Sequence, residues 1–258
     1  MVEIKNTKIY DLEDSVIASG NAMRLEPEEV NLKNFDKSLE RCKKLAKKGG
    51  GTGHSNFRTG ILVSFDLKYP QYFTKQAQRY HFLQYVSSTS MMHRITKMDF
   101  SECCNKYVSF RSKGQMNNLI YWYNVLVGDI QDGRSPEEVL GDYRHFVEES
   151  YNEIPNWSEF LIFPDPKKDP NEAYEQEPFT GEGTGAIPDL QKYIYDCYMR
   201  IISNCPMGAE LWVHCSTNYE QLATIYRQRK NHKLKEDWGE FCAWIESLPY
   251  AKELIICE

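Results

Sequence analysis

Hydrophobic and polar residues alternate along several stretches of the chain, and this period of two predicts strands. Every second residue from Ile61 to Leu67 is hydrophobic, so these side chains share one face of a half-buried strand. Shorter apolar runs predict strands at Ile4–Tyr10 and Glu210–Cys215, and the run Phe160–Phe163 suggests another. The remaining predicted elements follow the helical period instead.

Helical periodicity predicts an amphipathic, basic surface helix at residues 36–48 and further helices at residues 115–150, 190–203 and 237–247. The segment around Arg79 is also predicted to be helical, with an apolar face made of Phe82, Tyr85 and Val86. If one copy of the chain leaves that face uncovered, the face is a candidate surface for self-association.

The helix predicted after residue 217 carries a cation on its apolar face. Thr217 or Asn218 can cap its start, because either side chain can accept a hydrogen bond from the first turn. One face then follows at helical spacing, formed by Leu222, Ile225, Tyr226 and Arg229. Burying an unpaired guanidinium is costly, so Arg229 requires either an acidic side chain or an anionic ligand. A carboxylate would make Arg229 structural, whereas the guanidinium fork also matches a phosphate group.

Composition narrows the class of protein. The chain has 258 residues, of which 41% are hydrophobic and 26% charged, as expected for a globular protein with a large core. Its formal net charge of −6 argues against duplex nucleic acid as a partner. No apolar run approaches the roughly 20 residues of a membrane span, and the first residues lack the apolar core of a signal peptide. We therefore expect a cytoplasmic protein without a membrane span.

The cysteines indicate neither a zinc ribbon nor a thioredoxin-type redox site, because none of the eight forms a C-x-x-C pair. We expect them to be reduced, small core residues, and we expect no metal site. None lies in a Cys/His signature of the kind that marks a nucleophilic enzyme.

A loop-forming composition distinguishes residues 164–189, where prolines and glycines stand among acidic residues. Such a composition predicts an exposed insertion within a single domain spanning residues 1–258. A lid or a contact between subunits are alternatives to a plain surface loop.

Polar residues form a motif between residues 76 and 90. The run Arg79-Tyr80-His81 is preceded by Gln76 and followed, after seven intervening residues, by Thr89 and Ser90. Tyr80 and His81 can donate hydrogen bonds and stack on a ring.

These residues resemble the motifs of the flavin-dependent thymidylate synthases. The C-terminal motif of that family is matched by Asn218, Arg227, Arg229, His232 and Trp238. The family signature reads Arg-His-Arg, seven residues and Ser, with a Gln three positions before the first Arg. Gln76 and Arg79 match that signature, whereas Tyr80 and His81 replace its His and second Arg. A Gly-His pair ahead of an alternating strand is a further family feature, and His54 occupies that place.

The resemblance implies two groups of binding residues and a charge-stabilising role for Arg79 and Arg229. Contacts to FAD are implied for His54, Arg79, Tyr80, His81, Asn218 and His232. Contacts to the nucleotide dUMP are implied for Gln76, Arg79, Thr89, Ser90, Arg94 and Arg229, with Arg229 on the phosphate.

The resemblance also implies an α/β (α+β) fold, in which a central, mostly antiparallel sheet is flanked by helices, and a homotetramer with sites at subunit contacts. The implied reaction is the reductive methylation of dUMP at C5 to dTMP. Methylenetetrahydrofolate supplies the carbon, and FAD reduced by NADPH supplies the hydride. Because two of the three signature side chains differ, two alternatives stay open: a related enzyme such as a dUMP or dCMP hydroxymethylase, and a non-catalytic nucleotide-binding or interaction protein.

Overall fold

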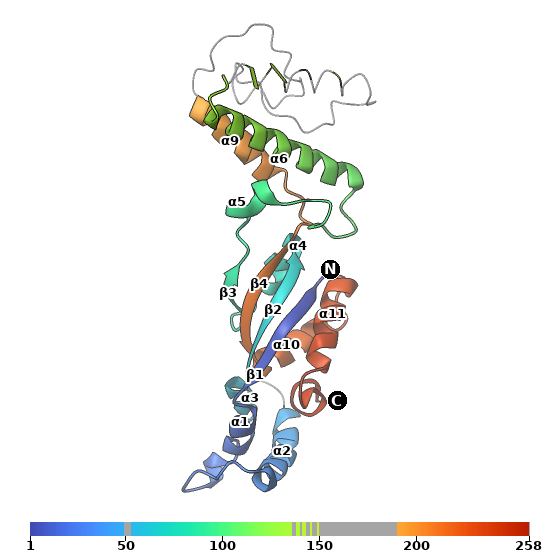
Figure 1. The fold of residues 1–258 in the computed structure, drawn as a ribbon. Coiled ribbons are helices and arrows are strands. Elements are labelled where there is room, and N and C mark those ends of the chain that lie inside the picture. Colours follow the sequence, from blue (N-terminus) through green and yellow to red (C-terminus); the bar gives the residue numbers. More distant parts are fainter. Residues whose placement is uncertain are drawn as a thin grey trace. The chain divides into compact units, whose positions relative to one another are not determined.

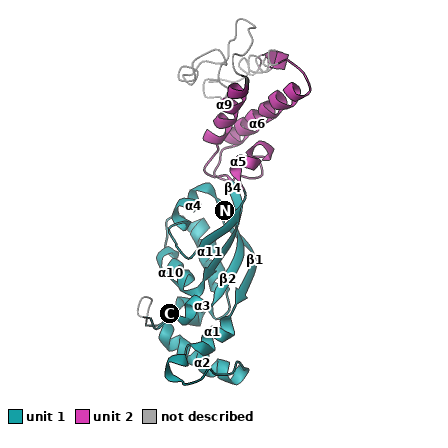
Figure 2. Cartoon of the chain, turned by 90° about the vertical axis from the view of Figure 1, so that its left-hand side faces the viewer, with its two compact units in different colours: residues 1–89, 210–258 teal, residues 90–209 magenta. Residues whose placement is uncertain are grey.

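The computed structural model describes residues 1–48, 53–135 and 190–257, together with isolated positions between 138 and 149. The chain divides into two compact units, which are coloured separately in Figure 2: residues 1–89 with 210–258, and residues 90–209. The predicted insertion at residues 164–189 and the apolar run Phe160–Phe163 lie outside the described residues.

A four-stranded antiparallel sheet forms the centre of the first unit (Figure 1). Its strands lie in the order β1-β2-β4-β3 and comprise β1 (Glu3–Tyr10), β2 (Leu62–Pro70), β3 (Gln84–Ser88) and β4 (Glu210–Asn218). The two central strands pair along their whole length, from Leu62 opposite Asn218 to Pro70 opposite Glu210. The antiparallel sheet with its flanking helices confirms the predicted fold class.

One face of the sheet is packed against helices. Val63, Phe65 and Leu67 are fully buried on that face, and the residues between them point to the other face. The Phe65 ring lies 4.4 Å from the ring of Trp244. The helices that cover this face are α4 (Gln71–Ala77), α10 (Tyr219–Arg229) and α11 (Lys235–Glu246). The alternation predicted from the sequence therefore separates a core face from an open face.

The rest of the first unit consists of α1 (Leu12–Ala18), η1 (Asn21–Met23), α2 (Leu32–Ala46), α3 (Phe57–Gly60) and the π-helical turn η4 (Lys252–Ile256). Helix α2 starts earlier than predicted, because the Asn31 side chain accepts a hydrogen bond from the backbone N–H of Asn34 and caps it. Phe35, Leu39 and Cys42 are buried, since α2 packs against α1 and η4. The predicted amphipathic surface helix is confirmed, because polar residues such as Lys33, Lys37 and Glu40 are exposed along its other side.

The second unit contains α5 (Met91–Arg94), η2 (Ile95–Lys97), α6 (Phe110–Gln131) and α9 (Leu190–Ser203). The long helices α6 and α9 pack together, with Met116, Leu119 and Cys197 buried in their core. Both helices lie where the sequence predicted helical structure. No helix in the described parts of the chain is long and apolar enough to cross a membrane.

The helix predicted around Arg79 is wrong. Helix α4 ends at Ala77, the chain turns at Arg79, and β3 begins at Gln84. Tyr85 pairs with Cys215 of β4, so a long-range strand pairing overrides the local helical period. Phe82 and Val86 are nevertheless 62% exposed each.

All eight cysteines are free thiols, and five of them are buried, namely Cys42, Cys104, Cys197, Cys215 and Cys242. Their burial confirms that these five are core residues. Burial also raises the pKa of Cys215 to about 12 and that of Cys242 to about 11, so these thiols stay protonated at neutral pH.

Candidate functional site

Arg229, in the last turn of α10, lies over the indole ring of Trp238. The guanidinium carbon is 4.6 Å from the ring centroid, which is a cation–π distance. Trp238 is fully buried in α11, and its ring centroid lies 4.4 Å from that of Phe73 and 5.7 Å from that of Phe241. The aromatic core thus provides a rigid platform beneath the cation.

Neutral groups hold the guanidinium of Arg229. Its Nε donates to the Tyr80 hydroxyl at 2.7 Å, and its Nη1 donates to Gln76 Oε1 at 3.3 Å. Gln76 Oε1 also accepts from Trp238 Nε1 at 2.9 Å. The Tyr80 hydroxyl in turn donates to Gln228 at 3.0 Å.

Within the described chain, no carboxylate pairs with Arg229, and its Nη2 has no hydrogen-bond acceptor. The side chain is half-buried rather than fully enclosed. No carboxylate of the described residues therefore neutralises its positive charge, which favours the anionic-ligand interpretation over the structural ion pair. We term Arg229, Gln76, Tyr80 and Trp238, together with the neighbouring His232, the Arg229 cluster.

His232 follows α10 and completes the Arg229 cluster. Its backbone N–H donates to the Arg229 carbonyl at 2.9 Å, and its ring meets the Trp238 ring edge-on at 6.1 Å. The Nδ1 atom accepts from the Leu234 N–H at 3.1 Å, so the neutral ring carries its proton on Nε2. Burial, and then the charges of Arg229 and Lys233, lower the pKa of His232. The structure thus favours a neutral imidazole with one free donor.

The lowered pKa of His232 predicts a loss of stability at acidic pH. Because this pKa is lower in the folded chain than in the unfolded chain, the unfolded chain binds more protons at pH values between the two. Stability is complete above the unfolded pKa of roughly 6.5 and is lost as the pH falls through the folded pKa. We expect the melting temperature of the wild type to fall more steeply than that of His232→Gln between about pH 7.5 and 5. Parallel pH profiles in circular-dichroism melts would contradict this assignment.

The other residues implied by the resemblance are not members of the Arg229 cluster. His54, Arg79 and His81 are exposed in turns, and Arg79 and His81 directly flank Tyr80 in the chain. Asn218 caps α10, where its Oδ1 accepts from the Gln221 N–H at 2.9 Å. It therefore lies at the opposite end of that helix from Arg229, about 16 Å away. Ser90 and Arg94 belong to the second unit, where Ser90 precedes α5 and Arg94 is its last residue.

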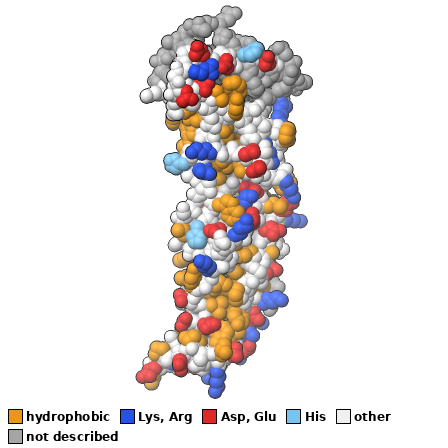
Figure 3. All heavy atoms as spheres, in the orientation of Figure 1, with side chains coloured by type: hydrophobic (Ala, Val, Ile, Leu, Met, Phe, Trp, Pro, Cys, Tyr) orange, Lys and Arg blue, Asp and Glu red, His pale blue; other side chains and the backbone are white. Residues whose placement is uncertain are grey.

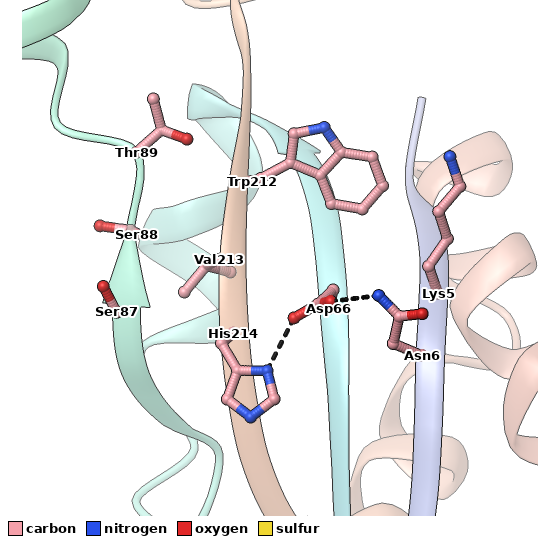
Figure 4. A pocket seen from close by; sticks show the side chains of 9 residues that line it. All are labelled: Lys5, Asn6, Asp66, Ser87, Ser88, Thr89, Trp212, Val213 and His214. Carbon is pink, nitrogen blue, oxygen red and sulfur yellow. Dashed lines mark hydrogen bonds and ion pairs between the residues drawn. The ribbon is translucent and has the colours of Figure 1, made fainter.

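Thr89 lies in a hollow of about 550 Å³ on the open face of the sheet (Figure 4). Its backbone N–H donates to the Trp212 carbonyl at 2.8 Å. The hollow is lined by Lys5, Asn6, Asp66, Ser87, Ser88, Thr89, Trp212, Val213 and His214.

In the view of Figure 3, the visible face mixes basic, acidic and hydrophobic side chains and carries no continuous basic patch.

A His–Asp pair forms the centre of this hollow. His214 Nδ1 lies 2.7 Å from Asp66 Oδ1, and Asn6 Nδ2 donates to Asp66 Oδ2 at 2.6 Å. These hydrogen bonds, first from Asn6 and then from His214, lower the pKa of Asp66. The carboxylate holds Nδ1 protonated and leaves Nε2 of the neutral ring as an acceptor. This arrangement can orient a ligand hydroxyl or accept a proton.

Sequence reasoning missed this pair. Asp66 and His214 each occupy a polar position in an alternating strand, and that alternation is the available signal. It places each side chain on the open face, but only the β2–β4 register places the two directly opposite one another. Across the described residues, no group of His, Cys, Asp and Glu is arranged to hold a metal ion.

The fold is that of the flavin-dependent thymidylate synthases. The chain is similar to two solved structures of the enzyme ThyX from Helicobacter pylori, both with FAD and dUMP bound. One is 12% identical with a TM-score of 0.52 and covers 98% of each chain; the other is 14% identical with a TM-score of 0.52 and covers 100% of this chain and 99% of that one. No family model and no curated protein matches the sequence. At such low identity the likeness establishes the fold alone.

Proposed function

We propose that the protein binds dUMP and methylates it at C5, in the manner of the flavin-dependent thymidylate synthases. The observation that carries this proposal is Arg229, a cation held by neutral partners on a helix of the matching fold. The two similar structures match almost the whole length of this chain, and both contain FAD and dUMP. This likeness supports a nucleotide as the anionic ligand.

In this proposal the nucleotide phosphate binds at the Arg229 cluster. Tyr80, Gln76 and Trp238 hold the guanidinium from three sides, so little side-chain entropy is lost when the anion binds. Nη2 and the second N–H of Nη1 face no protein acceptor in the described chain and supply the paired donors that a phosphate requires. Nε2–H of His232 is a further donor beside them.

A flavin fits the predicted cofactor residues in part. His54, Arg79 and His81 are exposed, so their donors are available to the pyrophosphate or the ring of FAD. Tyr80 does not fit this role, because it is buried and its hydroxyl is engaged by Arg229 and Gln228. Asn218 keeps its amide N–H groups for a ligand while its oxygen caps α10.

The proposed reaction requires no covalent bond between the protein and the nucleotide. The carbon comes from methylenetetrahydrofolate, and reduced FAD supplies the hydride that completes the methyl group. The side chains named here bind and orient the nucleotide, and Arg79 contributes positive charge where the pyrimidine becomes anionic. Since His54 and Arg79 are exposed in turns and are not part of the Arg229 cluster, the proposal includes a homotetramer in which neighbouring copies complete each site. The exposed Phe82 and Val86 offer apolar surface for that contact.

One observation favours a second candidate function. The residue at the signature His position, Tyr80, serves Arg229 instead of facing a cofactor. A related enzyme that hydroxymethylates dUMP or dCMP would need the same phosphate site but no hydride, because water completes its reaction.

The purified protein tests these proposals. We expect it to take up FAD, to bind dUMP in calorimetric titration and to form dTMP when methylenetetrahydrofolate and NADPH are supplied. Binding of dUMP without flavin uptake, with a hydroxymethylated product, would instead select the second function. A preparation that binds neither flavin nor nucleotide would refute both, and a monomer in light scattering at micromolar concentration would refute the shared site.

A further inference from the structure

Polar side chains from all four strands form one row in the hollow on the open face of the sheet (Figure 4), which we call the open-face hollow. Lys5 of β1 pairs with Asp66 of β2. Asp66 pairs with His214 of β4, which pairs in turn with Ser87 of β3. Directly opposite residues of an antiparallel sheet have their Cβ atoms about 4.5–5.5 Å apart. The row therefore gathers a cation, a carboxylate, an imidazole and a hydroxyl on one face.

A β-bulge in each edge strand shapes the ends of this row. In β1 one extra residue lies between Lys5 and Lys8, and in β3 one lies between Tyr85 and Ser87, relative to the partner strands. Asn6, in the first bulge, has a left-handed backbone with φ of 52°, and its Nδ2 donates to the carboxylate of the row at 2.6 Å. Bulges are common beside functional sites, where they re-aim side chains. Both bulges here bring polar side chains into the open-face hollow.

The two charged residues that line the hollow are already engaged by protein groups. Asp66 accepts from Asn6 and lies 2.7 Å from Nδ1 of His214. Lys5 pairs with Glu3 at 2.6 Å. Since one cation and one carboxylate line the hollow and each has protein partners, the hollow does not favour a charged ligand.

The groups that remain free for a ligand are neutral. Nε2 of His214 is left as an acceptor, because Nδ1 faces Asp66. The hydroxyls of Ser87, Ser88 and Thr89 line the same hollow and have no hydrogen-bond partner among the described residues. Each hydroxyl can both donate and accept. The hollow therefore presents an imidazole acceptor and three hydroxyls to a ligand.

We propose that the open-face hollow binds a sugar ring through its hydroxyl groups. A sugar is neutral, and each of its hydroxyls can donate and accept, which matches the imidazole acceptor and the three protein hydroxyls. The half-buried Trp212 supplies apolar surface for the C–H groups of the ring. The volume of about 550 Å³ is within the range of small-molecule sites. The inference does not depend on the proposed function, because the hollow shares only Thr89 with the residues implied for the nucleotide.

Saturation-transfer NMR tests the hollow with methyl β-D-ribofuranoside and methyl β-D-glucopyranoside as probes, since this method detects weak binding to a large protein. We expect the wild type to bind at least one of these sugars with millimolar affinity. His214→Phe keeps a ring but removes the acceptor, and should weaken this binding about three- to tenfold, as expected for one hydrogen bond. Asp66→Asn should also weaken it, because an amide can donate to Nδ1 and leave the proton on Nε2.

His93→Phe is the matched control, because it makes the same change at an exposed histidine of the second unit. We expect it to bind the sugar as the wild type does, and melting curves verify that each chain is folded. Three results would overturn the inference: binding of neither sugar at tens of millimolar, undiminished binding in both folded hollow variants, or an equal loss in the control.

Calorimetric titration of the same chains with dUMP separates the open-face hollow from the proposed nucleotide site. Equal dUMP affinity in the wild type and His214→Phe would support two distinct sites. A loss of dUMP binding in folded His214→Phe would make the hollow part of the nucleotide site and overturn the inference. A wild type that binds a sugar but no dUMP would refute the proposed function and leave the hollow as a sugar site.

Discussion

Replacing Arg229 by Ala is expected to weaken dUMP binding roughly ten- to a hundredfold, since a charge-assisted paired contact contributes about 1.5–3 kcal/mol. The structural basis is a guanidinium that lies over Trp238 and donates to Tyr80 and Gln76, with no carboxylate partner among the described residues. Arg229→Lys should recover only part of the affinity, because an ammonium cannot make the paired contact. Calorimetric titration with dUMP measures the three chains side by side.

Arg227→Ala is the matched control for this experiment, because it removes the same charge two positions earlier on α10 from an exposed side chain. We expect its dUMP affinity to equal that of the wild type. Arg229→Ala leaves no carboxylate of the described residues unpaired, so its melting temperature should fall only modestly. A folded Arg229→Ala chain with unaltered dUMP affinity would exclude the phosphate clamp.

Replacing Trp238 by Ala is expected to destabilise the protein by about 3–5 kcal/mol, the range for removing a large aromatic side chain from a core. Trp238 is fully buried between Phe73 and Phe241, and its Nε1 donates to Gln76. For a chain of 258 residues such a loss lowers the melting temperature by roughly 6–20 °C. Scanning calorimetry measures this fall.

Trp238→Phe separates packing from binding. It keeps most of the apolar ring but removes the donor to Gln76 and reduces the platform beneath Arg229. We expect a folded protein with a smaller stability loss and with weakened dUMP binding. Trp212→Ala is the control, because Trp212 is half-buried on the open face of the sheet and lies outside the Arg229 cluster. If Trp238→Ala melts no lower than Trp212→Ala, Trp238 is not the centre of this core.

Several elements of the fold follow from local sequence. The alternation from Ile61 to Leu67 identifies β2, because a period of two can bury only one face of a strand. Asn218 identifies the start of α10, because its side chain can satisfy a free N–H of the first turn. These local signals identify single strands and helices. The antiparallel sheet with flanking helices was predicted from the resemblance of the ordered motifs to a known family.

Local pattern fails where distant segments compete for the same residues. The segment from Phe82 to Val86 has a helical apolar pattern, yet β4 pairs with it and makes residues 84–88 a strand. Here the free energy of a long-range contact outweighs a local preference.

In the candidate site, too, some features follow from the local sequence and others only from tertiary contacts. By itself the sequence determined that Arg229 stands on the apolar face of its helix, because helical spacing suffices for that inference, and it predicted a negative group or an anionic ligand as the partner. Only the tertiary structure decided that its partners are Tyr80, Gln76 and Trp238, all uncharged. Likewise, only the register of β2 against β4 brings Asp66 to His214. Such contacts join residues far apart in the chain, and their identity depends on packing and register that no local pattern encodes.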